Sequence, residues 1–208
     1  MSFAQRERER LAQLLIDVGP EAPTLNEGWK TRDLAAHLYI RERKPLGAAG
    51  IFVPLAKGAL EKETERQKAR DYATVVREWA AGPPALIKPF DSAMNTSEHF
   101  IHHEDVRRGG AGAGPREFSG AVDKQLLKLA KRFGSLSLRK AEVPVVLTPP
   151  KLPPVTVGGK PGVAERGDDV LRVLGEPGEL LLWVSGRDAA QVEFRGRTDV
   201  VERLHRSI

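Results

Sequence analysis

The chain has 208 residues, of which 40% are hydrophobic and 29% charged, an ordinary composition for a folded protein that excludes an intrinsically disordered chain. It contains no cysteine, which excludes a disulfide framework, a thiolate zinc finger, an iron–sulfur cluster and a cysteine nucleophile, so any thiol chemistry needs a thiol from outside. The 33 basic and 28 acidic residues give a net charge of +5, but their signs alternate instead of gathering in a basic stripe, so we expect no nucleic-acid partner.

The hydrophobic pattern contains no membrane or export signal. No apolar run approaches the roughly 20 residues that a helix needs to cross a bilayer. The first ten residues are highly charged and lack the apolar core of a signal peptide. We therefore expect a cytoplasmic protein that has no membrane partner and exists as a monomer or homodimer.

The first two thirds of the chain are predicted to be helical. Ser2 is a good cap for a first helix, which Gly19-Pro20 ends. Thr31 is a good cap for a second helix, which runs to Lys44 before Pro45. Residues 45–56 show no clear pattern. Further helices are predicted over 57–67, over 71–79, from about 91–96 to Arg108, and from Ser119 onward.

The composition changes near Gly134, where β-branched residues and prolines become frequent. The spacing predicts strands over 143–147, 155–157, 169–173 and 191–194, and helices over 178–185 and 199–205. The fold class is therefore mainly α. A helical bundle over residues 1–134 is expected to precede a small α+β domain over residues 135–208.

Chemistry-bearing side chains concentrate in one predicted helix, where three of the five histidines lie within residues 99–103. Glu98 and His102 are four residues apart and share a helix face, and so do His99 and His103. Ile101 must face apolar surroundings and adjoins the Glu98/His102 line. We therefore expect Glu98 and His102 to face the bundle interior, and His99 and His103 to face solvent.

Two side chains one turn apart can grip a divalent metal, but a third ligand must come from elsewhere. His37 is the candidate because it lies among the apolar residues of the second predicted helix. An ordinary buried histidine is the alternative interpretation. Two histidines, one carboxylate and an open position are typical of a catalytic zinc site, and Ni²⁺ or Fe²⁺ suits the same ligands.

Two aspartates are candidates for orienting the imidazole rings. Asp33 precedes His37 by four residues, and Asp105 follows His102 by three. The alternatives are that Asp33 is an acid favoured by the first turn of its helix, and that Asp105 forms an ion pair with Arg107 or Arg108.

These motifs resemble the N-terminal domain of mycothiol-dependent maleylpyruvate isomerases, within the wider DinB-like metal-binding bundles of actinobacteria. The resemblance rests on Gly28-Trp29, on Arg32-Asp33-Leu34-Ala35-Ala36-His37-Leu38, and on Glu98-x-x-x-His102-His103-Glu104-Asp105-Val106-Arg107-Arg108. Residues 178–187 look like the small sterol-carrier-like domain that often follows.

The resemblance implies a DinB-like four-helix bundle with a divalent metal, usually zinc, held by His37, Glu98 and His102. It also implies a low-molecular-weight thiol such as mycothiol, whose sulfur would occupy the open metal position. Arg187 is the nearest counterpart of a substrate-clamping residue, with a plain surface arginine as the alternative.

The expected function is that of a metal-dependent enzyme, a thiol-dependent isomerase or transferase. The metal would activate the thiol or a water for isomerisation or sulfur transfer on a small electrophile, and Asp33, Asp105 and Arg187 are the catalytic candidates. The alternative is a non-enzymatic module, stabilised by its metal, that binds a lipid, a small ligand or a protein partner.

Overall fold

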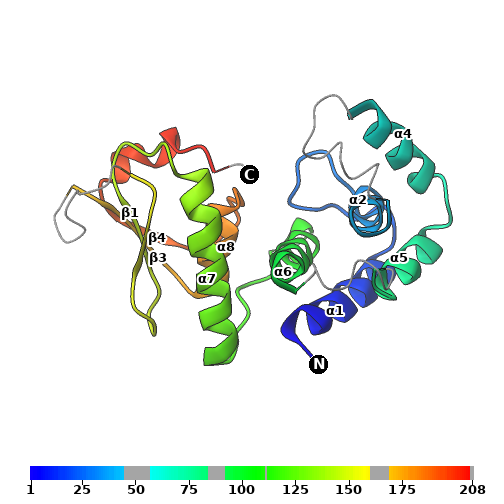
Figure 1. Cartoon of the computed structure of the whole chain (residues 1–208), viewed down its shortest axis with the longest axis horizontal. Coiled ribbons are helices and arrows are strands. Elements are labelled where there is room, and N and C mark those ends of the chain that lie inside the picture. Colours follow the sequence, from blue (N-terminus) through cyan, green and yellow to red (C-terminus); the bar gives the residue numbers. More distant parts are fainter. Residues whose placement is uncertain (45–56, 84–91, 111, 160–168, 207–208) are drawn as a thin grey trace. The chain divides into compact units, whose positions relative to one another are not determined.

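A computed structural model describes residues 1–44, 57–83, 92–110, 112–159 and 169–206. The chain divides into two compact units, Met1–Ala113 and Gly114–Ile208, which are treated separately below (Figure 1). None of the described helices is long and apolar enough to cross a lipid bilayer. The uninterpreted segment 45–56 lies outside the described residues.

The first unit is built from helices. Its described part contains five of them, one more than the four-helix bundle that the resemblance implies. They are α1 (Phe3–Val18), α2 (Thr31–Arg43), α4 (Lys57–Lys68), α5 (Tyr72–Ala80) and α6 (Ser92–Gly109). Helix α1 packs along α6 and α5, while α2 packs against α5 and α4.

Two local hydrogen-bond motifs fix where α1 and α2 begin. Ser2 caps α1 as predicted, because its hydroxyl accepts from the Gln5 backbone N–H at 3.2 Å and Gln5 Oε1 accepts from the Ser2 N–H at 2.9 Å. At α2 the cap is one residue earlier than the predicted Thr31. The Thr31 hydroxyl instead donates to the Gly19 carbonyl, so Thr31 becomes the first helical residue.

An apolar core joins α1, α2, α5 and α6. Buried leucines of α1 and α2 meet Val75, Val76 and Trp79 of α5, and Val106 of α6. The members of this cluster from α1 and α2 are Leu11, Ala12, Leu15, Leu34, Ala35, Leu38 and Tyr39. Burial of this surface is the main source of the unit's stability and fixes which faces of α2 and α6 are left for polar side chains.

The last residue of α6 touches the loop that leads into α2. A Cβ atom on Gly109 would overlap the Pro23 carbonyl oxygen and lie 2.5 Å from Thr24 Cα, whereas one on Gly110 would meet nothing within 4 Å. We expect Gly109→Ala to destabilise the protein by about 1–3 kcal/mol through overpacking, and Gly110→Ala to change stability by less than about 0.5 kcal/mol. Urea unfolding compares the two, and equal stabilities would contradict this contact.

The second unit combines two helices with a small sheet. Its elements are α7 (Gly120–Ser137), β1 (Val145–Thr148), β2 (Val155–Val157), β3 (Leu171–Leu174), α8 (Pro177–Val184), β4 (Glu193–Gly196) and the 3₁₀ segment η3 (Thr198–Arg203). The sheet order is β2-β1-β3-β4, with β1 and β3 parallel and the other pairs antiparallel. The predicted strands and α8 appear within a few residues, but the terminal helix is a 3₁₀ helix.

Helix α7 belongs with the sheet, so the boundary between the units lies at 113/114, one helix earlier than the 134/135 boundary that the sequence predicted. Its buried face packs against α8 and β2 (Figure 1). The approach to β2 is close, because a Cβ atom on Gly134 would lie 3.0 Å from Val157 Cγ2. The change in composition near Gly134 marks where strands begin, and not where the packing changes.

Candidate metal centre

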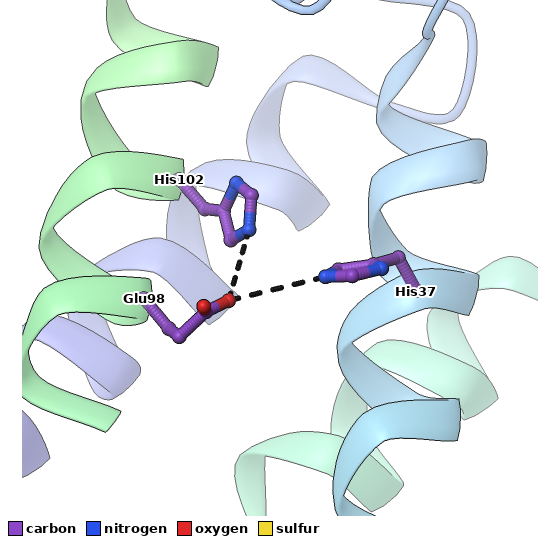
Figure 2. Close-up of side chains that lie close together, drawn as sticks. All are labelled: His37, Glu98 and His102. Atoms are coloured by element: carbon purple, nitrogen blue, oxygen red, sulfur yellow. Dashed lines mark ion pairs between the residues drawn. The ribbon is translucent and has the colours of Figure 1, made fainter. Parts of the chain in front are cut away.

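His37, Glu98 and His102 converge between two helices of the first unit. His37 projects from α2, and Glu98 and His102 project from successive turns of α6 (Figure 2). Glu98 Oε2 lies 3.2 Å from His102 Nε2 and 3.9 Å from His37 Nε2. The three potential ligand atoms all lie within 4.8 Å of one another. The structure thus brings together the three residues that the sequence analysis selected.

These distances fit a shared cation. In a tetrahedral zinc site with bonds of about 2.0–2.1 Å, two donor atoms lie about 3.3 Å apart. The spacing of 3.2 Å between Glu98 Oε2 and His102 Nε2 matches this value, whereas the 3.9 Å to His37 Nε2 exceeds it, so His37 would have to move inward to share the cation. Two imidazoles and one carboxylate are donors that zinc, nickel and iron accept.

Asp105 orients the ring of His102. Its Oδ2 lies 2.9 Å from His102 Nδ1, and Asp105 is fully buried. With the Nδ1–H donated to this carboxylate, Nε2 is directed toward Glu98, and a metal ion that displaced the Nε2 proton would meet its lone pair there. This geometry corresponds to the orienting role considered for Asp105, while Arg107 and Arg108 pair with Glu104 instead.

Asp33 and Arg187 have other surroundings. Asp33 Oδ2 accepts from the Lys30 backbone N–H at 2.9 Å, and Oδ1 lies 2.8 Å from Lys68 Nζ, so this carboxylate caps α2 and pairs with α4. Arg187 belongs to the second unit, where its Nη1 donates to the Ser185 carbonyl at 2.8 Å and it lines a cavity of about 260 Å³. Neither observation assigns these residues a catalytic role.

The surroundings of the three converging residues shift their proton affinities in different directions. Burial would raise the pKa of Glu98, but hydrogen bonds from His102 and His37, and then the charge of Arg41, hold it well below its usual value. Burial lowers the pKa of His37. Burial would also lower the pKa of His102, but Asp105 and Glu98 outweigh it and raise the pKa to about 9. At neutral pH Glu98 is therefore ionised and His102 is protonated, so a metal ion would have to displace a proton from His102.

Aromatic rings flank the cluster. The Trp29 ring centroid lies 5.4 Å from that of His37, and the His37 centroid lies 5.3 Å from that of His102. Trp29 is partly buried and packs against the apolar core of the first unit. It acts on the ring of His37 through packing and not as a ligand, since indole offers no metal-ligating atom.

The other face of α6 is polar and buried, which the sequence analysis missed. His99 and His103, expected to face solvent, are 1% and 6% exposed. His99 Nδ1 lies 3.0 Å from the Ala4 carbonyl oxygen and Nε2 lies 3.3 Å from Glu42 Oε1, while His103 Nδ1 lies 2.9 Å from Glu7 Oε2. The expectation failed because α1, whose charges alternate in sign along the sequence, packs on this face with its own polar groups.

Comparison with known proteins gives a likeness at the level of fold. No protein-family model matches the chain, and no curated protein sequence does. Two solved structures match it, mycothiol-dependent maleylpyruvate isomerase and a histidine-to-alanine mutant of that enzyme. Each is 16% identical over 92% of this chain and 90% of the other, with a TM-score of 0.61. The chain therefore shares the fold of that isomerase over most of its length.

Proposed function

We propose that the protein is a metal-dependent enzyme that uses a low-molecular-weight thiol, mycothiol or a similar one, to isomerise or transfer sulfur to a small electrophile. The observation that carries this proposal is the convergence of His37, Glu98 and His102 on one point between α2 and α6. The shared fold with a mycothiol-dependent isomerase supports the thiol, and so does the absence of cysteine from the chain.

The three side chains would hold a divalent cation, zinc in the first place, with nickel or iron as alternatives. Three protein ligands leave the fourth position of a tetrahedral zinc to a thiol or a water. A cation at this place would act as a Lewis acid that lowers the pKa of the thiol or water brought to it.

The chain's own residues would prepare that place. Glu98 contributes the negative charge, which offsets part of the charge of a divalent cation. Asp105 keeps the Nδ1 proton of His102 in place, so that Nε2 stays directed at Glu98. Packing against Trp29 limits the movement of the His37 ring. The side chains are thus held close to a ligating geometry before a cation arrives, which is the arrangement that favours tight binding.

The test is a turnover assay on the zinc-loaded full chain, with maleylpyruvate as the electrophile and mycothiol as the thiol. We expect conversion that requires both zinc and thiol and that is lost in His102→Ala. Conversion that persists without the thiol would contradict the proposal. A protein that holds zinc but converts no electrophile with any thiol would favour the non-enzymatic module.

A further inference from the structure

Arg41 connects α2 to α6 at two points beside the converging residues. Its Nη1 donates to Asn95 Oδ1 at 2.9 Å, and its Nε lies 3.6 Å from Glu98 Oε2. The Arg41 side chain is 11% exposed, and Asn95 is 3% exposed. The guanidinium is therefore enclosed by protein, and its position is fixed by more than one contact.

The helix register explains why these residues meet. Arg41 follows His37 by four residues and lies one turn further along the same face of α2. Asn95 and Glu98 precede His102 by seven and four residues, so all three lie on one stripe of α6. The stripe of α2 that carries His37 and Arg41 therefore faces the stripe of α6 that carries Asn95, Glu98 and His102.

The next residue of α2, Glu42, has different partners. Glu42 binds Arg8 of α1 and faces His99, so it belongs to the buried ion pair between α1, α2 and α6. Arg41 has no part in that ion pair. Its contacts go to the amide of Asn95 and to the same carboxylate oxygen of Glu98 that faces both histidines.

We propose that Arg41 is a positioning residue, whose guanidinium, anchored by Asn95, holds the Glu98 carboxylate with Oε2 turned toward His37 and His102. A glutamate has three rotatable side-chain bonds and would otherwise occupy several rotamers. The planar guanidinium can reach the amide and the carboxylate at once, whereas a lysine ammonium is a single point of charge. The inference rests on the proposed function, because it assigns a role in preparing the proposed metal centre.

The test measures zinc affinity of the full chain by competition with a chromophoric chelator, together with thermal unfolding of each metal-free variant. We expect Arg41→Lys, which keeps the charge, to weaken zinc binding about 10–100-fold, the usual loss when a residue that orients a ligand is replaced. Asn95→Ala should also weaken zinc binding. Asn95→Asp, which retains an acceptor oxygen for Arg41, should bind zinc more tightly than Asn95→Ala. The matched control is Arg43→Lys on the same helix, since Arg43 contacts the Gly82 carbonyl instead; it should change affinity by less than about twofold, well below that usual loss.

The outcomes separate this inference from the proposed function. Wild-type affinity in Arg41→Lys would overturn the positioning role and leave the metal centre standing. If the wild-type protein binds no zinc, the proposed function fails, and a crystal structure of metal-free Arg41→Lys decides the positioning role alone. A Glu98 carboxylate displaced from the two histidines in that structure would support it, and an unmoved carboxylate would overturn it.

Discussion

The His102→Ala variant is expected to lose zinc binding while its helices stay folded. The substitution leaves two ligands, His37 and Glu98, on different helices, and two ligands do not hold zinc firmly. The loss in affinity should exceed the roughly 10–100-fold loss that follows removal of a residue orienting a ligand. Chelator competition measures the affinity, and circular dichroism checks that the helices persist.

His103→Ala is the matched control for this prediction. His103 is adjacent in sequence and buried on the same helix, but its ring contacts Glu7 of α1 instead of Glu98. We expect it to reduce stability, because it leaves the buried Glu7 carboxylate without this contact, and to leave zinc affinity close to that of the wild type. Equal losses of affinity in the two variants would mean that His102 acts through the packing of α6 and not as a ligand.

The Glu42→Ala variant is expected to lose about 3–5 kcal/mol of unfolding free energy, the usual cost of removing one partner from a buried ion pair. Arg8 Nη1 and Nη2 donate to the two carboxylate oxygens of Glu42 at 2.7 and 2.9 Å. The two side chains are only 8% and 4% exposed, so Arg8 would keep a buried charge without this counterion. The melting temperature should fall by roughly 10 °C for a protein of this size.

The control for Glu42→Ala is Glu9→Ala, because Glu9 is an exposed acid in the same alternating run as Arg8. It should change stability by less than about 0.5 kcal/mol. A loss below about 1 kcal/mol in Glu42→Ala, which is within the range of an exposed ion pair, would contradict the buried bidentate pair.

The difference in unfolding free energy between wild type and Glu42→Ala should depend on pH through the ionisation of Glu42. Burial would raise the pKa of Glu42, but contacts with His99 and Arg8 outweigh it and lower the pKa below its ordinary value of 4.5. A carboxylate with a lowered pKa contributes stability that is fully present above 4.5 and is lost as the pH falls through the folded-state value. The gap between wild type and Glu42→Ala should therefore be constant at neutral pH and shrink in acid, as unfolding at pH 7 and below 4 would show.

The candidate ligands could be predicted because their geometry is local. The spacing of Glu98 and His102 fixes a common helix face wherever the helix lies, and the apolar neighbours of His37 fix the inward face of α2. The contact of Asp105 with His102 could be predicted for the same reason, because the two residues are one turn apart on the same helix. Caps and strand positions were also recovered to within a few residues, since they depend on short hydrogen-bonded motifs.

Other features depend on which helix covers which face, and sequence spacing does not contain that information. The alternating charges near Arg8 are typical of a solvated helix, yet Glu7 and Arg8 are buried because α1 lies against α6 and α5. The same packing buries His99 and His103. Asp33 is near His37 in sequence, but its carboxylate turns to Lys30 and Lys68.

Direct measurement of metal content tests the central claim. Full-length protein without a histidine tag would be stripped with a chelator, incubated with zinc, separated from excess metal and analysed by elemental mass spectrometry. The account predicts about one zinc per chain, the stoichiometry of a single mononuclear site, and much less in His102→Ala. Zinc absent from folded wild-type protein, or bound equally by His102→Ala, would contradict the proposal that His37, Glu98 and His102 form a metal centre.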